Sequence, residues 1–424
     1  MNKKFLIPII LIVITCLGGF LRFYKNTENP PSLNIDEVSF GYSAYSILKT
    51  GRDEHGVFMP ILFESTGDFK NPIPVYLMIP SIAIFGLNEF GVRFPTVVVG
   101  TLTILLFFLL VKNLLRNNFI AFLGAILFAV SPWHIYFSRY AYDPLLANFF
   151  LLLGVVMFLK FIEGRMFWGV MSATSFAMGM YSGFAVRLFT PFFVTVLLIL
   201  NFKKIINNKS QVLVFLLCCI FLSLPLIYFS LFSKANTRLG MIFLANDIDF
   251  TRYVVPDHLK GGEFFLLFFF WLKRYLNYFQ PDFLFFTGLN MTLQGTFGLG
   301  VLYLFELPWL VSGVVELVVN RSNFRWLILF WILIGIVPAS IANNEQSAGR
   351  SLIILPPLIM IITLGLNKFI DTIKDFKSKI LKTAIIILYS IFIFIILIHA
   401  FLVFSIHFPV QKGEDFMEGT NETV

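Results

Sequence analysis

Apolar runs of about twenty residues recur along the chain, and they constrain the fold more than any other feature. A run of this length is what an α-helix needs to cross the hydrocarbon core of a bilayer. The chain is 58% hydrophobic and only 13% charged, with a mean hydropathy of +0.84. Residues 1–424 are therefore predicted to form a single all-α polytopic membrane domain, and not two or three soluble domains.

About eleven transmembrane helices are predicted. They are placed at 5–23, 95–111, 119–137, 144–160, 167–184, 188–202, 211–231, 300–319, 326–342, 351–366 and 383–405. The first of them shows no small-residue cleavage site before Arg22, so we interpret it as a retained helix and not as a signal peptide.

The distribution of charge predicts how these helices are oriented. With the N-terminus in the cytoplasm, six short cytoplasmic segments carry half of the 32 Lys and Arg residues, and most acids face outward. This is the positive-inside pattern, and we expect a multi-pass protein of the plasma membrane. The net charge of +8 thus has a topological explanation, and no basic tract indicates a nucleic acid partner.

Two large outer loops follow from this topology. The first, 24–94, contains the short apolar stretch 74–85, which is expected to lie at the membrane interface because counting it as a crossing would invert every later loop. The second, about 232–299, carries Trp271 and many Phe and Tyr residues. We expect it to lie as a lid on the bilayer surface.

The polar stretch Asn34-Ile35-Asp36-Glu37 comes directly after the first helix, and two interpretations of its acids stay open. Asn34 and Glu37 have the spacing of a helix capping box, and Gly51 would end that helix. The same acids, beside a membrane in a chain with few charges, could instead take part in catalysis.

Further charged residues fall in the outer loops of the predicted topology. In chain order they are Asp68, Lys70, Arg139, Asp143, Arg187, Asp282 and Arg350. Any one of them could be a solvated turn residue or a headgroup anchor. Acids and cations together at one membrane face indicate a polar cavity.

Transfer of a sugar from a lipid phosphate needs this combination of charges. A carboxylate takes the proton of the acceptor hydroxyl, which contributes typically ~10²–10⁴-fold to the rate. Lys and Arg side chains stabilise the negative charge that the departing phosphate gains. A single displacement of this kind inverts the anomeric carbon.

Several segments, in order between residues 5 and 366, also carry a family resemblance. They are Asn34-Ile35-Asp36-Glu37, Asp68-Phe69-Lys70-Asn71-Pro72, 88–95, 139–143, 281–288 and Gly349-Arg350-Ser351 with Pro356. Together they resemble motifs of the GT-C superfamily of membrane glycosyltransferases. The most similar group is glycosyltransferase family 39 and its relatives, which includes protein O-mannosyltransferases and aminoarabinose lipid A transferases.

The resemblance implies a GT-C fold, a polyprenyl-phosphate sugar donor and roles for individual residues. Asp36 would be the catalytic base, Glu37 would support it or the acceptor, and Asp143 would be the second acid. Lys70, Arg139 and Arg350 would bind the phosphate or the acceptor, with Arg187 and Asp282 as further binding candidates. The acceptor could be a protein, a lipid or an envelope glycan.

Two other functions stay open. A lipid or sugar transporter would place ionisable residues near mid-membrane and show repeat symmetry, and the sequence has few of the former and no visible repeat. A polymerase or ligase would use a diphosphate-linked glycan at the same face. No cofactor is required by the pattern. A divalent metal stays open because Asp247-Ile248-Asp249 is a DxD triplet, although an outer-face site would meet lipid-linked sugar and not a nucleotide sugar.

Overall fold

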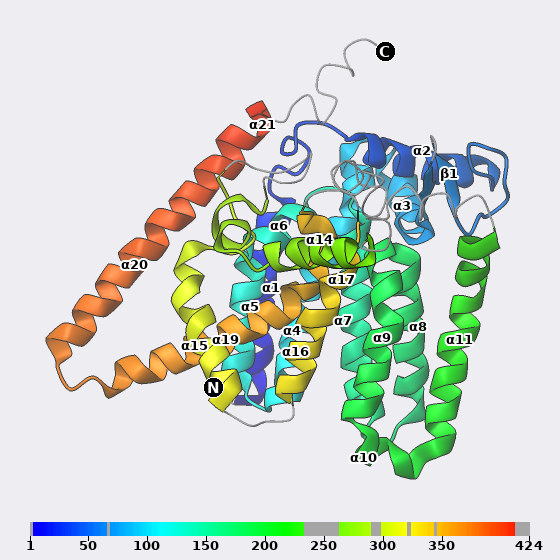
Figure 1. Cartoon of the computed structure of the whole chain (residues 1–424). Coiled ribbons are helices and arrows are strands. Elements are labelled where there is room, and N and C mark those ends of the chain that lie inside the picture. The colour runs from blue at the N-terminus through cyan, green and yellow to red at the C-terminus, as the bar shows by residue number, and fades with distance from the viewer. Residues whose placement is uncertain are drawn as a thin grey trace.

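The computed structural model describes residues 3–65, 68–232, 263–289, 298–319, 324–342 and 346–411. It is a bundle of long helices with a layer of shorter elements over one end (Figure 1). Within the described ranges, the only strands form one two-stranded antiparallel hairpin. The prediction of an all-α protein is confirmed.

The first half of the chain supplies most of the long helices. They and their short connecting helices are α1 (Lys3–Phe23), α4 (Glu89–Leu115), α5 (Asn118–Val130), α6 (Pro132–Ser138), α7 (Asp143–Phe161), α8 (Met166–Ser182), α9 (Phe184–Leu200), α10 (Phe202–Ile205), η1 (Ile206–Asn208) and α11 (Lys209–Phe232). Aromatic rings pack tightly between α7 and α8, where Gly154 leaves room for the ring of Phe176.

The second half continues the bundle. Its described elements are α14 (Glu263–Asn277), η4 (Phe283–Thr287), η5 (Leu304–Glu306), α15 (Leu307–Val319), α16 (Phe324–Gly335), α17 (Val337–Ser340), α18 (Ala348–Ser351), η6 (Leu352–Ile354), α19 (Leu355–Asp375), α20 (Lys379–Leu402), η7 (Val403–His407) and α21 (Phe408–Gln411). α15 and α19 approach so closely that a Cβ on Gly365 would lie 1.7 Å from the carbonyl oxygen of Trp309. Small residues at such crossings are what allows membrane helices to pack backbone to backbone.

Six described helices have the length and hydropathy to cross a bilayer. They cover Leu6–Phe23, Glu89–Leu115, Asp143–Phe161, Lys209–Ser230, Ala348–Asp375 and Lys379–Val410, and the bent pair α5 and α6 is a seventh candidate. The eleven predicted segments fall on helix in whole or in large part, but the predicted number of eleven spans is not shown. Several of these segments are shorter because the helix ends or is interrupted within them. For example, the helix Phe184–Leu200 has only 17 residues.

The bend between α5 and α6 is 54° and has a local cause. Ser131 and Pro132 interrupt the helix, and the Ser131 hydroxyl accepts a hydrogen bond from the backbone N–H of His134 to begin α6. The buried guanidinium of Arg22 donates to the carbonyl of Ala129, near the end of α5, at 3.0 Å. The bend directs the chain toward the connection 139–142, which leads into α7.

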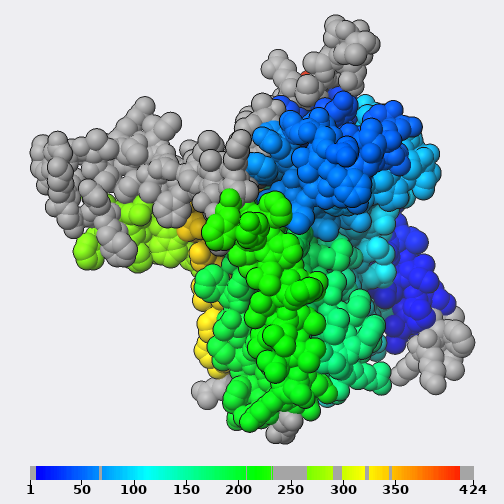
Figure 2. Space-filling view, turned by 90° about the vertical axis from the view of Figure 1, so that its right-hand side faces the viewer, coloured from blue at the N-terminus to red at the C-terminus, as the bar shows by residue number. Residues whose placement is uncertain are grey.

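The layer over the bundle consists of α2 (Ile35–Thr50), the hairpin of β1 (Phe63–Ser65) and β2 (Asp68–Lys70), and α3 (Pro72–Phe85). We call it the α2–α3 layer, and it forms the upper blue surface in Figure 2. Phe40 and Ala44 of α2 pack against Val75 and Met78 of α3. The capped helix that was expected to end at Gly51 corresponds to α2, and the apolar stretch 74–85 lies in α3. The position of that stretch at a membrane interface stays a prediction.

The second predicted outer loop is described only in part, by 263–289 and from residue 298 onward. In the described part, α14 lies across the bundle beside α17 (Figure 1). Asp247-Ile248-Asp249 lies outside the described residues.

Candidate active site

Asn34, Asp36 and Glu37 begin α2 as a capping box. The Asn34 side chain accepts hydrogen bonds from the backbone N–H groups of Asp36 and Glu37, and the Glu37 carboxylate accepts one from the N–H of Asn34. Gly51 ends the helix with a φ of 71°, a left-handed conformation that favours glycine. The capping interpretation of the sequence is therefore correct, and it leaves the second role of the acids to be examined.

The two neighbouring acids point to different environments. The Glu37 side chain is completely buried, whereas the Asp36 side chain is 42% exposed. Successive residues of a helix are rotated by about 100° about its axis, so one of two adjacent acids can face the protein interior while the other faces a cavity.

A cavity of about 230 Å³ lies between the α2–α3 layer and the end of the bundle. Its lining includes two acids and one cation predicted from the sequence, Asp36, Asp143 and Arg350. The other lining residues come from the connection before α7 and from α7, α9, α17, α18 and their flanks: Tyr142, Pro144, Ala147, Gly183, Phe184, Ala185, Val186, Leu188, Pro338, Ile341, Ala342, Gly349 and Ile353.

Lys70 and Arg187 are linked to the acids of this cavity. The Lys70 ammonium forms an ion pair with the Asp36 carboxylate. The side-chain amide of Asn71 donates to Asp143 Oδ2 at 2.6 Å, and its oxygen accepts a hydrogen bond from Arg187 Nη2 at 2.8 Å. The hairpin β1–β2 and the start of α3 thus carry Lys70 and Asn71 to acids on two other elements.

Arg350 is the lining cation of this site. Its Nη1 atom is buried and has no hydrogen-bond partner among the described residues. A buried guanidinium N–H without an acceptor is costly. The chemistry of this donor suits an anionic oxygen, such as that of a phosphate.

Tyr142 lines the cavity next to α18, the helix that carries Arg350. A Cβ on Gly349 would lie 1.9 Å from the Tyr142 hydroxyl oxygen, so this ring packs directly against the backbone of α18. Burial, and then the neighbouring charge of Asp143, raises the pKa of Tyr142. Its hydroxyl stays protonated at neutral pH and is available as a hydrogen-bond donor.

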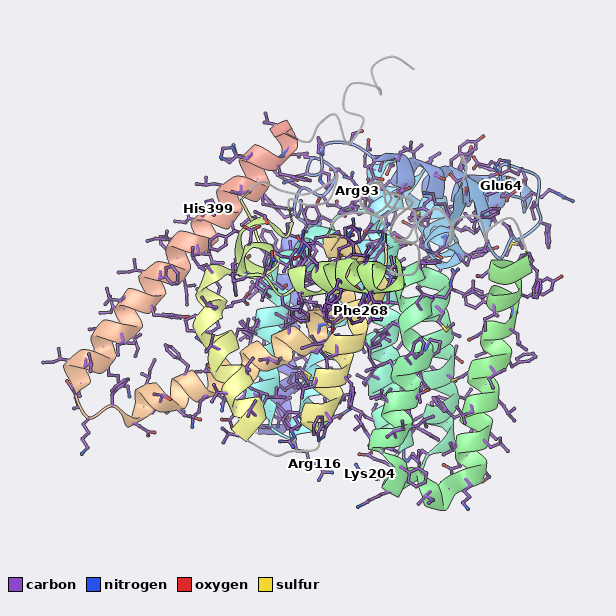
Figure 3. The ribbon with its side chains drawn as sticks, viewed as in Figure 1. Glu64, Arg93, Arg116, Lys204, Phe268 and His399 are labelled. Atoms are coloured by element: carbon purple, nitrogen blue, oxygen red, sulfur yellow. The ribbon has the colours of Figure 1, made fainter. Side chains whose placement is uncertain are left out.

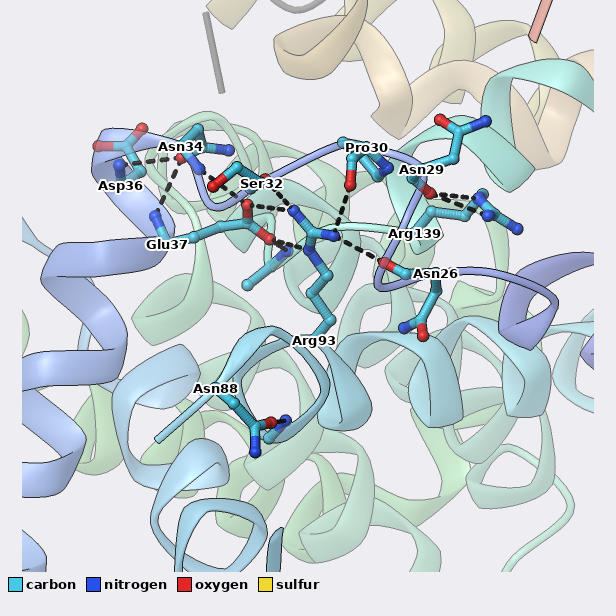
Figure 4. A network of polar contacts seen from close by, with 12 residues as sticks. Asn26, Asn29, Pro30, Ser32, Asn34, Asp36, Glu37, Asn88, Arg93 and Arg139 are labelled. Atoms are coloured by element: carbon cyan, nitrogen blue, oxygen red, sulfur yellow. Dashed lines mark hydrogen bonds and ion pairs between the residues drawn. The ribbon is translucent and has the colours of Figure 1, made fainter. Parts of the chain in front are cut away.

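Glu37 forms a buried ion pair with Arg93 and not with a cavity residue (Figure 4). Arg93 Nε donates to Glu37 Oε1 at 2.9 Å and Nη2 donates to Oε2 at 3.1 Å. The other N–H groups of Arg93 bind the carbonyl oxygens of Asn26, at 2.6 Å, and Pro30, at 2.9 Å. Arg93 therefore connects α4 to the chain segment that leads into α2.

Glu37 also connects the start of α2 to the connection 139–142 that precedes α7. Its Oε1 accepts a hydrogen bond of 2.8 Å from the backbone N–H of Ala141, two residues before Asp143. The carboxylate thus fixes the chain next to Asp36 to the chain next to Asp143. This contact sets the relative positions of the two cavity acids.

Arg139 is buried among backbone carbonyl groups. Its guanidinium donates to the carbonyl oxygens of Leu21 at 2.9 Å, Lys25 at 3.1 Å and Asn29 at 2.9 Å. Burial, with Arg93 as a smaller cause, lowers the pKa of Arg139 to about 10, so it remains charged at neutral pH. Arg139 does not line the cavity, and its observed contacts bind the turn after α1 to the end of α6.

Asp282 is the predicted site residue that the structure leaves apart from the others. It is exposed, it directly precedes η4, and its carboxylate accepts a hydrogen bond of 2.6 Å from the Thr287 hydroxyl. It is not among the residues that line the cavity.

Three residues of this region were not singled out as site residues from the sequence, namely Asn71, Arg93 and Tyr142. Arg93 carried a signal, because it is a lone charge at the entry to a long apolar run. Asn71 and Tyr142 lie within motifs quoted above but have no charge to mark them. Only their contacts with Asp143, Arg187 and Gly349 identify them.

The cavity and the basic residues Arg116 and Lys204 lie at opposite ends of the bundle. Figure 3 shows Arg93 and Glu64 at the end that carries the α2–α3 layer, and Arg116 and Lys204 at the other end. Within the described ranges, no three His, Cys, Asp or Glu side chains gather in a way that could bind a metal ion.

Comparison with known proteins gives several matches. An uncharacterized protein of Aquifex aeolicus is 27% identical over 180 residues, which are 42% of this chain and 34% of that protein. ArnT from Cupriavidus metallidurans bound to undecaprenyl phosphate has a similar structure, with a TM-score of 0.57 and 11% identity, covering 87% of this chain and 61% of that chain. Archaeal oligosaccharyltransferase AglB from Archaeoglobus fulgidus, in complex with an inhibitory peptide and a dolichol-phosphate, has a TM-score of 0.55 and 13% identity, covering 96% of this chain and 56% of that chain.

The similar structures show the fold, and a family model shows the family. The solved structures are GT-C membrane glycosyltransferases, so the expected GT-C fold is confirmed, although this chain spans less than two thirds of each of them and about a third of the Aquifex protein. The model of the family named dolichyl-phosphate-mannose-protein mannosyltransferase matches residues 12–239, more than half of the 424. That segment runs from α1 to the end of α11 and includes the acidic motif, so the chain belongs to the dolichyl-phosphate-mannose-protein mannosyltransferase family.

Proposed function

We propose that this protein is a glycosyltransferase that moves a sugar from a polyprenyl-phosphate carrier to a hydroxyl acceptor. The observation that carries the proposal is that Asp36, Asp143 and Arg350 line one cavity, with Lys70 and Arg187 linked to its acids. The family name refers to a dolichyl-phosphate donor, and the similar ArnT structure contains undecaprenyl phosphate, which supports the same class of donor.

In the proposed reaction, Asp36 acts as the general base. It takes the proton of the acceptor hydroxyl while the acceptor oxygen forms a bond to the anomeric carbon. The bond from that carbon to the carrier phosphate breaks, and its electron pair passes to the phosphate oxygen. A single displacement of this kind inverts the anomeric configuration.

The cations then stabilise the charge that the leaving phosphate gains. Among the described residues, a buried N–H group of Arg350 has no hydrogen-bond partner, and Lys70 forms an ion pair with Asp36. Both side chains could therefore donate to a phosphate at the cavity. Asp143 is the second acid of the site and the alternative base. Asn71 and Arg187 fix its position.

The other candidates receive different proposed roles. The buried pair with Arg93 supports a positioning role for Glu37, and the carbonyl contacts of Arg139 support the same for that residue. Asp282 keeps the binding role that the family resemblance implies, without a contact at the cavity in its favour.

We also propose the finer topology: eleven crossings of the plasma membrane, a cytoplasmic N-terminus and a cavity on the extracytoplasmic side. The positive-inside rule supports it, since Arg116 and Lys204 lie at the end of the bundle opposite to the α2–α3 layer, which carries Glu64 (Figure 3). The lid role of the loop near 232–299 belongs to the same proposal. The acceptor is a protein, a lipid or an envelope glycan.

The test is transfer by purified protein in lipid, with radiolabelled polyprenyl-phosphate sugars as donors and a crude envelope extract as the acceptor source. We expect Asp36→Asn, a near-isosteric change, to lower the rate by about 10²–10⁴-fold while the donor still binds. Asp371→Asn is the matched control, because Asp371 is exposed and paired with Lys374 on α19. That variant is expected to transfer at the wild-type rate.

Three other results would contradict the proposal in distinct ways. Equal transfer by wild type and Asp36→Asn would assign the base to Asp143. Transfer only from diphosphate-linked glycans would indicate a polymerase or ligase. Movement of lipid or sugar across vesicles without any transfer would indicate a transporter.

A further inference from the structure

One face of α14 is hydrogen-bonded to the end of α17 and to Ala342, two residues after that helix. Trp271 Nε1 donates to the Ser340 hydroxyl at 3.0 Å, and Arg274 Nη1 donates to the carbonyl oxygen of Ala342 at 2.8 Å. Phe265 and Phe269 are exposed on the other side of the helix, and the exposed ring of Phe268 packs beside Trp271. α14 therefore contacts the bundle through side chains that donate hydrogen bonds.

Tyr278, just after α14, is hydrogen-bonded to α17 and to Ser347, which directly precedes α18. Its hydroxyl donates to the carbonyl oxygen of Ala339 at 3.3 Å, and the backbone N–H of Ser347 donates to the same hydroxyl oxygen at 2.9 Å. The side chain is only 2% exposed. Burial raises the pKa of Tyr278, so the hydroxyl keeps the proton that it donates to Ala339.

α17, α18 and the two residues that follow α17 form one wall of the cavity. Pro338, Ile341 and Ala342 line it on the side of α17, and Gly349 and Arg350 line it on the side of α18. The contacts of Tyr278 lie immediately beside these residues on both sides. The Ser347 hydroxyl also accepts a hydrogen bond from the N–H of Arg350, at 3.3 Å, so a displacement of Ser347 is passed directly to Arg350.

We propose that Tyr278 is a positioning residue for the anion-binding part of this cavity, acting through Ser347 on Arg350. The inference rests on the proposed function, because it identifies which residue sets the place of the cation that meets the donor phosphate. Tyr278 itself does not line the cavity, so it is not expected to touch the donor.

The variant Tyr278→Phe removes only the hydroxyl, and Tyr275→Phe is its matched control. Tyr275 lies three residues earlier, and its hydroxyl donates to the carbonyl oxygen of Leu333 on α16 at 2.9 Å, away from the cavity lining. Each variant therefore loses a hydroxyl contact to the bundle. Only Tyr278→Phe loses the hydrogen bonds with Ala339 and Ser347.

The first measurement is hydrogen–deuterium exchange, which does not depend on any activity. We expect faster exchange in peptides from 337–351 in Tyr278→Phe and wild-type exchange there in Tyr275→Phe. Equal exchange in the two variants would overturn the inference whatever the protein transfers.

The second measurement is the affinity for a sugar-free polyprenyl phosphate, together with KM and kcat for the sugar donor. We expect Tyr278→Phe to weaken lipid-phosphate binding and raise KM by about three- to tenfold, with a smaller change in kcat. In an Arg350→Gln background the same change should weaken binding no further. An equal loss in both backgrounds would show that Tyr278 does not act through Arg350, whereas a wild type that binds no polyprenyl phosphate would instead refute the proposed function.

Discussion

Replacing Glu37 by Gln distinguishes a positioning acid from a catalytic one. Glu37 and Arg93 are both completely buried, and the carboxylate accepts two hydrogen bonds from Arg93 and one from the N–H of Ala141. Gln has nearly the same size but no charge, and its NH₂ group would face the N–H donors of Arg93 or Ala141. Breaking a buried ion pair by removing one partner costs about 3–5 kcal/mol, because the other charge stays buried without compensation.

Thermal unfolding in lipid nanodiscs measures this loss. With the unfolding entropy per residue of globular proteins, a loss of 3–5 kcal/mol in a chain of this length lowers the midpoint by about 3–6 °C. The double variant Glu37→Gln with Arg93→Gln should lose less than the sum of the single variants, since the uncompensated charge is then absent. Glu28→Gln is the matched control, because the Lys25–Glu28 pair is exposed and screened by solvent, so its loss should leave the midpoint unchanged.

The reasoning would be refuted by a stable but inactive variant. If Glu37→Gln unfolds within a degree of wild type, binds the donor normally and loses transfer by a hundredfold or more, Glu37 takes part in the chemistry. If Glu37→Gln is destabilised as expected, the fraction of molecules that stays folded should still bind the donor. Its transfer rate should fall far less than the rate of Asp36→Asn.

Two further predictions concern residues at the cavity. Arg187→Met removes the hydrogen bond of 2.8 Å to the Asn71 oxygen, so the Asn71 amide is no longer oriented toward Asp143. We expect the rate of transfer to fall about tenfold in steady-state kinetics, and an unchanged rate would contradict a role for this contact. Gly349→Ala places a Cβ 1.9 Å from the Tyr142 hydroxyl oxygen, which forces the ring or α18 to move. This overpacking should cost roughly 1–3 kcal/mol and weaken donor binding, as measured by unfolding and by lipid-phosphate titration, and wild-type values in both assays would show that the wall adapts.

Local features of the site were predictable from the sequence. The spacing of Asn34 and Glu37 predicted a capping box, and Gly51 was predicted to end the helix; both are observed. Such features depend on residues within one or two helical turns, so a short stretch of sequence contains all the interacting groups.

The different environments of the adjacent acids Asp36 and Glu37 were not predictable in this way. Glu37 is buried because Arg93, 56 residues later in the chain, lies where α4 begins, and Asp36 faces the cavity because Lys70 and α7 lie on its other side. The sequence shows that both are acids. It does not show which neighbour each of them meets.

The outer charges show the same limit. Their placement in outer loops was read from hydropathy, yet Asp36, Asp143 and Arg350 line the cavity, whereas Arg139 binds backbone carbonyl groups and Asp282 binds Thr287. A uniform set of loop charges therefore divides into different environments once the helices pack.

By itself, the sequence determined that this protein is a helical membrane protein with a capped acidic motif and a recognisable family. Hydropathy, capping and motif order depend on residues that are near one another in the sequence, so they can be recognised without the structure. The tertiary structure alone decided which charges share a cavity and which residues, such as Asn71 and Tyr278, bind its walls together. Those contacts join segments more than fifty residues apart, and they exist only because the helices pack in one arrangement.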